Sequence, residues 1–250
     1  MEKLKYRKID INCDLGEGLG NEAEIFPFIN SCNIACGGHT GDVPSMTRTI
    51  RGALRHRAKI GAHPSYPDRE HFGRRAMDMG RAELMDSIRD QLADFERALS
   101  QCGAAMHHIK AHGALYNQTA KDEKSARAYL EALEDYRERA ILYVPYGSVV
   151  AALARNMGFG IWFEAFADRN YRSDLSLLPR GEKDAMIGEP QKVLEHILPM
   201  IREGRVKPVE GPSRELRAHT LCVHGDNPRV VEILTYLSHE LPKNNVQPSK

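Results

Sequence analysis

The sequence has no long hydrophobic run, and no apolar stretch approaches the roughly 20 residues that span a bilayer. Its first residues, MEKLKYRKIDINC, pass from charged residues directly into an apolar strand pattern, with no signal-peptide core between them. We therefore expect a cytoplasmic protein that does not enter the membrane.

The sequence also lacks an excess of charge of either sign. It contains 35 Lys and Arg residues against 34 Asp and Glu residues, for a formal net charge of +1. Bulk electrostatics therefore favours neither nucleic acid nor an anionic membrane surface as a partner. Small molecules and other proteins remain as ligands, and the sequence leaves homo-oligomerisation open.

Paired cysteine motifs and standard nucleotide or nucleophile motifs are missing as well. The five cysteines are scattered among apolar residues, and Cys32 and Cys36 have no second pair to complete a zinc cluster. We expect reduced core thiols. No G-x-x-x-x-G-K-[ST] loop and no G-x-S-x-G elbow occurs. A nucleotide would therefore bind without a standard phosphate loop, and covalent catalysis by Ser or Cys is disfavoured.

What the sequence contains is a regular alternation of short apolar runs with helix-length segments. The runs predict strands at 9–13, 32–36, 59–62, 107–110, 141–144, 160–164 and 220–223. Helices are expected at 44–57, 81–101, 121–139, 148–156, 190–202 and 227–239. Strands that alternate with helices pair in parallel through right-handed crossovers.

This alternation and the length of 250 residues predict one (β/α) barrel with about seven parallel strands. No interruption marks a domain boundary, so the barrel domain is expected over residues 1–243, followed by a flexible tail at 244–250. The irregular segment 170–188 is long for a connection, and we expect it to lie over the strand ends as a lid.

Polar residues gather after almost every predicted strand. In a parallel barrel these positions converge on one face, where the fold places its active site. Histidine is not needed to fill a barrel, because Val, Ile and Leu do so without a desolvation cost. The candidate site residues are Asn12, Asp14, Glu17, His39, Asp42, His63, Lys110, His112, Tyr116, Glu164, Asp168, Arg169, His224 and Asp226.

Two kinds of chemistry fit these residues. His39, His63 and His112 with Asp14 or Asp42 would suit a divalent metal with nitrogen and oxygen ligands. The alternative is metal-free, with carboxylates as general bases and His or Lys as acids. Basic residues at the rim, which are Lys110, Arg169, Arg74 and Arg75, are candidates for contacts to an anion.

Six separated blocks of the sequence resemble the LamB/YcsF family. They are DINCDLGEG, NIACGGHTGD, IGAHPSYPDREHFGRR, IKAHGALYN, EAFADRNYRSD with LLPR, and VHGDNP, in this order between residues 9 and 228. The resemblance implies a (β/α)₇-like barrel related to the glycoside hydrolase and deacetylase barrels. It further implies ATP-driven cleavage of 5-oxo-L-proline to L-glutamate, together with the separate B and C subunits of a 5-oxoprolinase.

The implied reaction assigns roles to the candidates, because opening a stable lactam needs activation, for instance phosphorylation of the amide oxygen by ATP and attack of water. Catalytic candidates are Asp14, His39, His63, Lys110 and His112, and the candidate metal ligands are Asp14, His39, His63 and His112. Candidates for substrate binding are Asn12, Glu17, Tyr116, Glu164, Asp168, Arg169, His224 and Asp226.

Four positions depart from the family pattern. Gly38 stands in place of an aromatic residue, Ala111 in place of proline, Leu175 in place of glycine, and Cys13 in place of alanine. Gly38 and Leu175 are expected beside the pocket. Two other functions stay open at this point: a stand-alone metal-dependent amidase or deacetylase, and a subunit that binds a lactam without catalysis.

Overall fold

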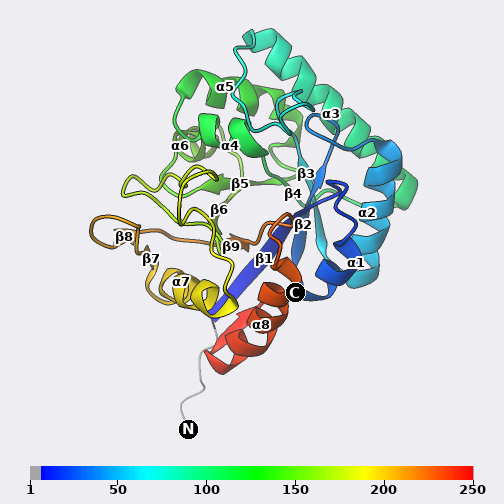
Figure 1. The fold of residues 1–250 in the computed structure, drawn as a ribbon. Helices are drawn as coiled ribbons and strands as arrows, with labels where there is room; N and C mark the ends of the chain where they lie inside the picture. The colour runs from blue at the N-terminus through cyan, green and yellow to red at the C-terminus, as the bar shows by residue number, and fades with distance from the viewer. Residues whose placement is uncertain (1–6, 250) are drawn as a thin grey trace.

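The computed structural model describes residues 7–249, which form a closed barrel of seven parallel strands (Figure 1). Each strand pairs with the next along the chain, and the pairing of the last strand with the first closes the barrel. The prediction of a seven-stranded (β/α) barrel is confirmed. Its strands are β1 (Arg7–Leu15), β2 (Ser31–Ala35), β3 (Lys59–His63), β4 (His108–Ile109), β5 (Ile141–Pro145), β6 (Ile161–Phe166) and β9 (Thr220–Cys222).

Helices surround the barrel where the sequence predicts them, except that the helix expected at 121–139 ends at residue 132. Side chains of Asp42, Asp122 and Ser148 cap three of the helices by accepting a backbone N–H three residues later. Asp42 is therefore a helix cap. The long helices are α2 (Val43–His56), α3 (Arg81–Cys102), α5 (Glu123–Ala132), α6 (Val149–Asn156), α7 (Pro190–Glu203) and α8 (Val230–Lys243).

Several short elements are absent from the sequence prediction because they are too short to show a hydrophobic period. They are α1 (Glu22–Ile25), η1 (Phe26–Phe28), α4 (Gly113–Thr119), η2 (Glu134–Tyr136), and the antiparallel strands β7 (Arg205–Val206) and β8 (Arg214–Glu215). Of these, α4 matters most for function, because it begins directly after His112.

The flexible tail expected at 244–250 is wrong for residues 246–248. These residues form strand β10 (Val246–Pro248), which pairs in parallel with the start of β1, and Val246 is completely buried. The structured domain thus continues past residue 243. The buried side chain of Val246 and the parallel pairing with β1 hold the segment in place. The strand has only three residues, so no hydrophobic pattern in the sequence distinguishes it from a tail.

The inside of the barrel contains buried polar side chains, although Val, Ile and Leu would fill a barrel without a desolvation cost. Along β1, Ile9 and Ile11 are buried in the hydrophobic core, whereas Asp10 and Asn12 alternate with them and bond to buried polar side chains of other strands. In this network Thr220 Oγ1 lies 2.7 Å from both Asp10 Oδ2 and Asn12 Nδ2. Buried polar groups of this kind are stable only when they are hydrogen-bonded.

Gly61 of β3 makes room for one member of this network, His108. A Cβ atom at residue 61 would clash with the imidazole ring of His108, which accounts for glycine there. We expect Gly61→Ala to lower the free energy of unfolding by about 1–3 kcal/mol, because the imidazole has to move and its bond to Asn33 is disturbed. Urea unfolding measures this. Gly160→Ala is the matched control, since a Cβ there meets nothing within 4 Å, and equal losses in both variants would contradict the steric explanation.

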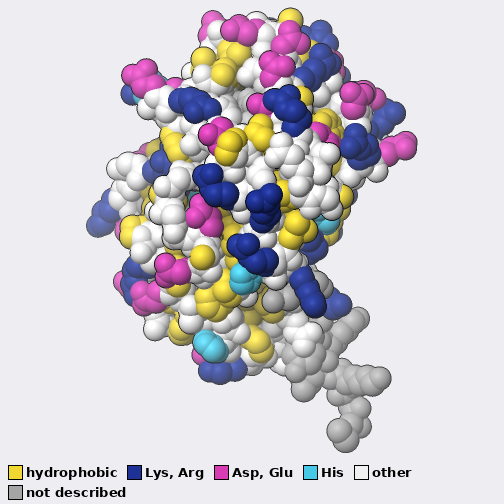
Figure 2. Space-filling model, turned by 90° about the vertical axis from the view of Figure 1, so that its right-hand side faces the viewer, with side chains coloured by type: hydrophobic (Ala, Val, Ile, Leu, Met, Phe, Trp, Pro, Cys, Tyr) yellow, Lys and Arg dark blue, Asp and Glu magenta, His cyan; other side chains and the backbone are white. Residues whose placement is uncertain are grey.

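Figure 2 shows the side of the molecule where α2 and α3 lie, and Lys and Arg side chains gather near the middle of this face. Helix α2 buries Ile50 and Ala53 and exposes Arg48, Arg51 and Arg55, as its amphipathic spacing requires. Among residues 7–249, no helix is long and apolar enough to cross a membrane.

Candidate functional site

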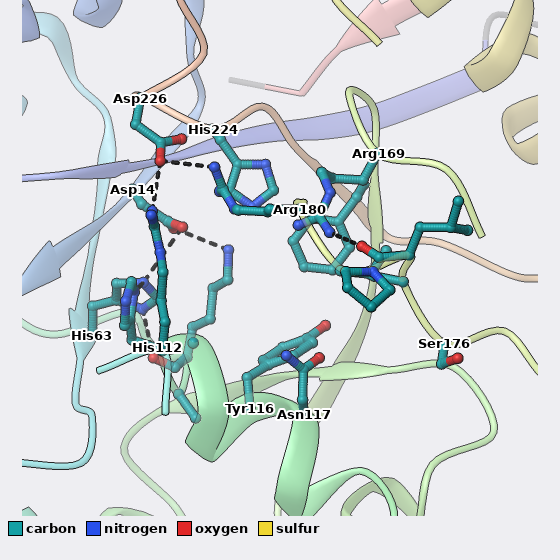
Figure 3. Close-up of a pocket in the computed structure, with 18 of the residues that line it drawn as sticks. Asp14, His63, His112, Tyr116, Asn117, Arg169, Ser176, Arg180, His224 and Asp226 are labelled. Carbon is teal, nitrogen blue, oxygen red and sulfur yellow. Dashed lines mark hydrogen bonds and ion pairs between the residues drawn. The ribbon is translucent and has the colours of Figure 1, made fainter. Parts of the chain in front are cut away.

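A cavity of about 670 Å³ opens at the carboxyl ends of the barrel strands (Figure 3). Residues that end or follow β1, β3, β4, β6 and β9 line it, and seven residues of the segment after β6 form part of its wall. These seven are Arg172, Asp174, Ser176, Leu177, Leu178, Pro179 and Arg180. Cavities of roughly 300–1,000 Å³ at this end of a barrel are typical binding sites for small molecules. Part of segment 170–188 therefore borders the cavity at the strand ends, as predicted, and its role as a lid stays a prediction.

Nine of the candidate residues line this one cavity. They are Asp14, Glu17, His63, Lys110, His112, Tyr116, Arg169, His224 and Asp226. Four others, namely Asn12, His39, Glu164 and Asp168, are not among the lining residues and are buried behind the first set. The structure therefore does not bring these four side chains to the cavity surface. They are predicted as site residues because the sequence does not place the end of a strand to within one residue.

Lys110 is the buried cation of the site, with a side chain only 2% exposed. Its Nζ lies 2.9 Å from Asp14 Oδ1, 2.9 Å from Glu164 Oε1 and 3.2 Å from Cys222 Sγ. Burial works against the ammonium charge, but Asp14, the Cys222 sulfur and Glu164 outweigh it and raise the pKa of Lys110 well above its ordinary value. Lys110 is therefore a permanent positive charge at the floor of the cavity.

Asp14 stands beside this cation and is ionised. Burial alone would raise the pKa of its carboxyl group, but His63 and Lys110 more than compensate and hold the pKa well below the usual range. Asn33 Nδ2 also donates to Asp14 Oδ1 at 2.7 Å, which fixes the carboxylate. Its other oxygen, Oδ2, lies 3.4 Å from His63 Nε2.

One ring nitrogen of His63 faces one ring nitrogen of His112. His63 Nδ1 lies 2.8 Å from the carbonyl oxygen of Lys110, and His112 Nε2 lies 3.0 Å from that of Phe72. Since a carbonyl oxygen only accepts, each of these two nitrogens carries a proton. The remaining nitrogens, His63 Nε2 and His112 Nδ1, face each other at 3.0 Å. Such an arrangement needs a shared proton or a metal ion between them.

The residues around these two nitrogens fit a divalent metal. One ligand atom from each of Asp14, Glu17, His63 and His112 falls within 4.8 Å of the others. Histidines that bind metals usually donate their second N–H to a backbone carbonyl, as both do here. Glu17 therefore takes the place predicted for His39.

His39 supports the cluster from behind. Its ring stacks on that of His112, with centroids 3.7 Å apart and planes at 2°. Its Nδ1 lies 3.0 Å from Ser65 Oγ, and its Nε2 lies 3.3 Å from Glu17 Oε1. Both ring nitrogens are thus engaged with protein groups, and the residue positions Glu17 and His112 instead of reaching the cavity.

A second possible ligand set, Asp14 with Cys222 and His224, is also compact. The Nζ of Lys110 contacts both Asp14 and Cys222 and supplies the positive charge at this position. A metal there would meet the ammonium group of Lys110 at close range, which disfavours it electrostatically. His224 is instead held by Asp168, with 2.7 Å between Nδ1 and Oδ1.

Because His108 is completely buried, we expect the stability of the fold to depend on pH. Burial, assisted by neighbouring positive groups, lowers its pKa well below the ordinary value for histidine. The unfolded chain takes up a proton at this residue below about pH 6.5, but the folded chain does not. Stability is therefore complete above that pH and is lost as the pH falls. We expect the free energy of unfolding to drop by on the order of 1 kcal/mol or more between pH 7 and pH 5.

Urea unfolding at the two pH values checks this expectation. In His108→Gln the drop should shrink, whereas the control His71→Gln, which changes a partly exposed histidine outside the cluster, should keep it. An undiminished drop in His108→Gln would contradict the assignment.

Residues that the prediction misses come from α4 and from the segment after β6. Asn117 of α4, and Ser176 and Arg180 of the segment, line the cavity beside the predicted Tyr116 (Figure 3). The hydroxyl of Tyr116 is buried and has no hydrogen-bond partner among the described residues. Asn117 and Arg180 belong to the sequence blocks IKAHGALYN and LLPR, which could have indicated them, whereas Ser176 lies in none of the blocks.

The departures from the family pattern have structural explanations at two positions. A Cβ atom at Gly38 would clash with Ser65 Oγ and Gln91 Oε1, so Gln91 occupies the space of a larger side chain. Leu175 has φ of 66°, a left-handed conformation that glycine adopts without strain. Neither residue lines the cavity, but Leu175 lies between Asp174 and Ser176, which both line it. Ala111 does line it.

Comparison with known proteins extends over nearly the whole chain. A family model described as the LamB/YcsF family matches residues 9–250. The A subunit of 5-oxoprolinase from Bordetella parapertussis is 40% identical over 243 residues, which are 95% of this chain and 96% of that protein. The protein of the same name from Pyrococcus furiosus is 39% identical over 245 residues, 96% of each chain. The solved lactam utilization protein of Thermus thermophilus has a TM-score of 0.89 at 33% identity and covers 96% of this chain and 98% of its own.

Proposed function

Because the chain belongs to the LamB/YcsF family, we propose that it opens the ring of 5-oxo-L-proline to L-glutamate, coupled to hydrolysis of ATP. In this proposal it acts as the A subunit of a 5-oxoprolinase together with separate B and C subunits. Its relatives of about 40% identity carry that name, and the matched structure is named for lactam utilization. Its four buried cysteines and one partly buried cysteine, all free, suit the cytoplasm.

The single observation that carries the proposal is the charge arrangement at the floor of the cavity. The ammonium group of Lys110 lies beside the ionised Asp14, and the facing nitrogens of His63 and His112 lie next to them. A lactam is a stable amide, so its opening needs a cation for the charge that develops on oxygen, a base for water, and an acid for the leaving nitrogen. All three groups converge here.

We assign the roles from these positions. Lys110 stabilises negative charge on the activated amide oxygen, because its own charge does not depend on pH near neutrality. Asp14 accepts a proton from the attacking water and passes it to His63 Nε2, which lies 3.4 Å from its Oδ2. His63 with His112 then returns this proton to the ring nitrogen. Glu164 and His39 hold Lys110 and His112 in place from behind.

A divalent metal fits the four residues Asp14, Glu17, His63 and His112. When bound, it would polarise an amide or phosphate oxygen as a Lewis acid. In that case His63 and His112 would use the nitrogens that face each other as ligands, and the second N–H of each would stay on its backbone carbonyl.

An assay of the purified chain, alone and with its B and C partner subunits, tests the proposal. The expected result is L-glutamate from 5-oxo-L-proline only when the partners and ATP are both present. Turnover of an amide by the chain alone without ATP, with one metal per chain by elemental analysis, would instead identify a metal-dependent amidase or deacetylase. Binding of 5-oxo-L-proline without any turnover in the full mixture would identify a non-catalytic subunit.

A further inference from the structure

Three loops of the barrel meet at the outer part of the cavity and bring two arginines onto one carboxylate. Arg74 comes from the loop after β3, Arg180 from the segment after β6, and Asp226 from the loop after β9. Arg74 Nη2 lies 2.6 Å from Asp226 Oδ2, and Arg180 Nη1 lies 2.8 Å from the same oxygen (Figure 3). The proposed chemistry uses none of these three residues.

At the outer part of the cavity the arginine side chains outnumber the carboxylates that pair with them. Two guanidinium groups share one carboxylate, and a third, Arg169, also lines the cavity. The guanidinium of Arg169 donates to the carbonyl oxygens of Leu178 and Ala185 and so receives no compensating charge from them. The outer part of the cavity therefore has an excess of positive charge, which favours an anionic ligand.

Asp226 pairs with the two arginines through only one of its two carboxylate oxygens. Only its Oδ2 accepts from the two arginines, while its Oδ1 is buried and has no hydrogen-bond partner within residues 7–249. A carboxylate that enters with both oxygens can pair with the fork of a guanidinium, which gives stronger and better oriented hydrogen bonds. A buried oxygen without a partner is costly, so replacement of Asp226 by such an anion relieves this cost.

We propose that Arg74 and Arg180 form the subsite for the carboxylate of the substrate, and that Asp226 occupies this subsite in the free chain. This inference rests on the proposed function, since 5-oxo-L-proline carries one carboxylate next to its lactam ring. The two arginines are then the specificity-determining residues that select the amino-acid lactam over a lactam without a carboxylate. Asp226 is an internal competitor that the substrate displaces.

Calorimetric binding to the purified chain, with 5-oxo-L-proline and with 2-pyrrolidinone, tests the inference. 2-Pyrrolidinone has the same lactam ring without the carboxylate. Arg74→Gln and Arg180→Gln are each expected to raise the Kd for 5-oxo-L-proline at least tenfold and to leave the Kd for 2-pyrrolidinone unchanged. Asp226→Asn is expected to lower the Kd for 5-oxo-L-proline, because it removes the competing charge.

Arg127→Gln is the matched control, since Arg127 pairs with Glu123 on the exposed side of α5 and its replacement is expected to leave both affinities unchanged. Equal losses for the two ligands in the arginine variants, or weaker binding of 5-oxo-L-proline by Asp226→Asn, would overturn the subsite. Circular dichroism of each variant separates these results from misfolding. Absence of 5-oxo-L-proline binding by the wild-type chain would overturn the subsite, whereas failure of the proposed function shows separately as absence of L-glutamate in the assay with the partner subunits and ATP.

Discussion

Replacement of Lys110 by Met is expected to abolish formation of L-glutamate by the complex of this chain with its partner subunits. It is also expected to lower the free energy of unfolding by about 3–5 kcal/mol, because removal of one partner leaves buried carboxylates without a compensating charge. The carboxylates concerned are those of Asp14 and Glu164, each 2.9 Å from the ammonium group. A glutamate assay and urea unfolding measure the two effects.

The control for this variant is Lys192→Met, which removes an exposed lysine paired with Glu189 on α7. It should leave both the rate and the stability unchanged. The double variant Lys110→Met with Glu164→Gln should regain part of the stability but none of the activity, which separates the two roles of the lysine. Wild-type activity in any variant without Lys110 would refute its role in charge stabilisation.

Substitution of Asp14 by Asn, of His63 by Gln or of His112 by Gln should each reduce ATP-dependent lactam opening at least tenfold. Each change removes a base, an acid or a metal ligand but keeps the approximate size of the side chain, so the chain is expected to remain folded. The rate of glutamate formation and circular dichroism together check this. Elemental analysis of the same samples is expected to show less bound metal in all three variants if a metal is present in the wild type.

His71→Gln serves as the control for the histidine variants, because His71 pairs with Asp68 in the loop after β3 and is not among the residues that line the cavity. It should retain the full rate. Wild-type rates in all three variants of the cluster would show that the chemistry takes place elsewhere.

The sequence predicts the barrel well because its signal is repeated. Each of the seven strands is a short apolar run followed by polar residues, and each long helix shows a clear apolar spacing. Short elements such as β10 and α4 have no such repetition. Strand β10 is held by its pairing with β1, and the position of α4 is set by the end of β4, which it follows. Both elements therefore depend on the tertiary structure and not on a local pattern.

The composition of the site is likewise predicted in part. The convergence of strand ends brings Asp14, His63, Lys110 and His112 to one cavity as expected. The sequence does not predict which of these side chains reach the cavity. If the end of a strand is misplaced by one residue, a side chain expected to line the cavity lies in the barrel interior or behind the residues that line the cavity. For this reason Glu17, and not His39, lies within metal-ligand distance of the others.

The arginines of the outer cavity illustrate the same limit. Arg180 lies 46 residues from Asp226 in sequence, and Arg74 lies 152 residues from it. No local pattern links them, since their contact depends on how the segment after β6 folds across the barrel mouth. Only the three-dimensional structure shows that both bind one carboxylate.

A crystal structure of the chain soaked with 5-oxo-L-proline tests directly whether this cavity binds the lactam. We expect the lactam ring in the cavity at the strand ends, with its amide beside Lys110 and Asp14 and its carboxylate between Arg74 and Arg180. Occupancy of any other site by 5-oxo-L-proline, with this cavity unchanged, would show that the cavity is not the lactam site.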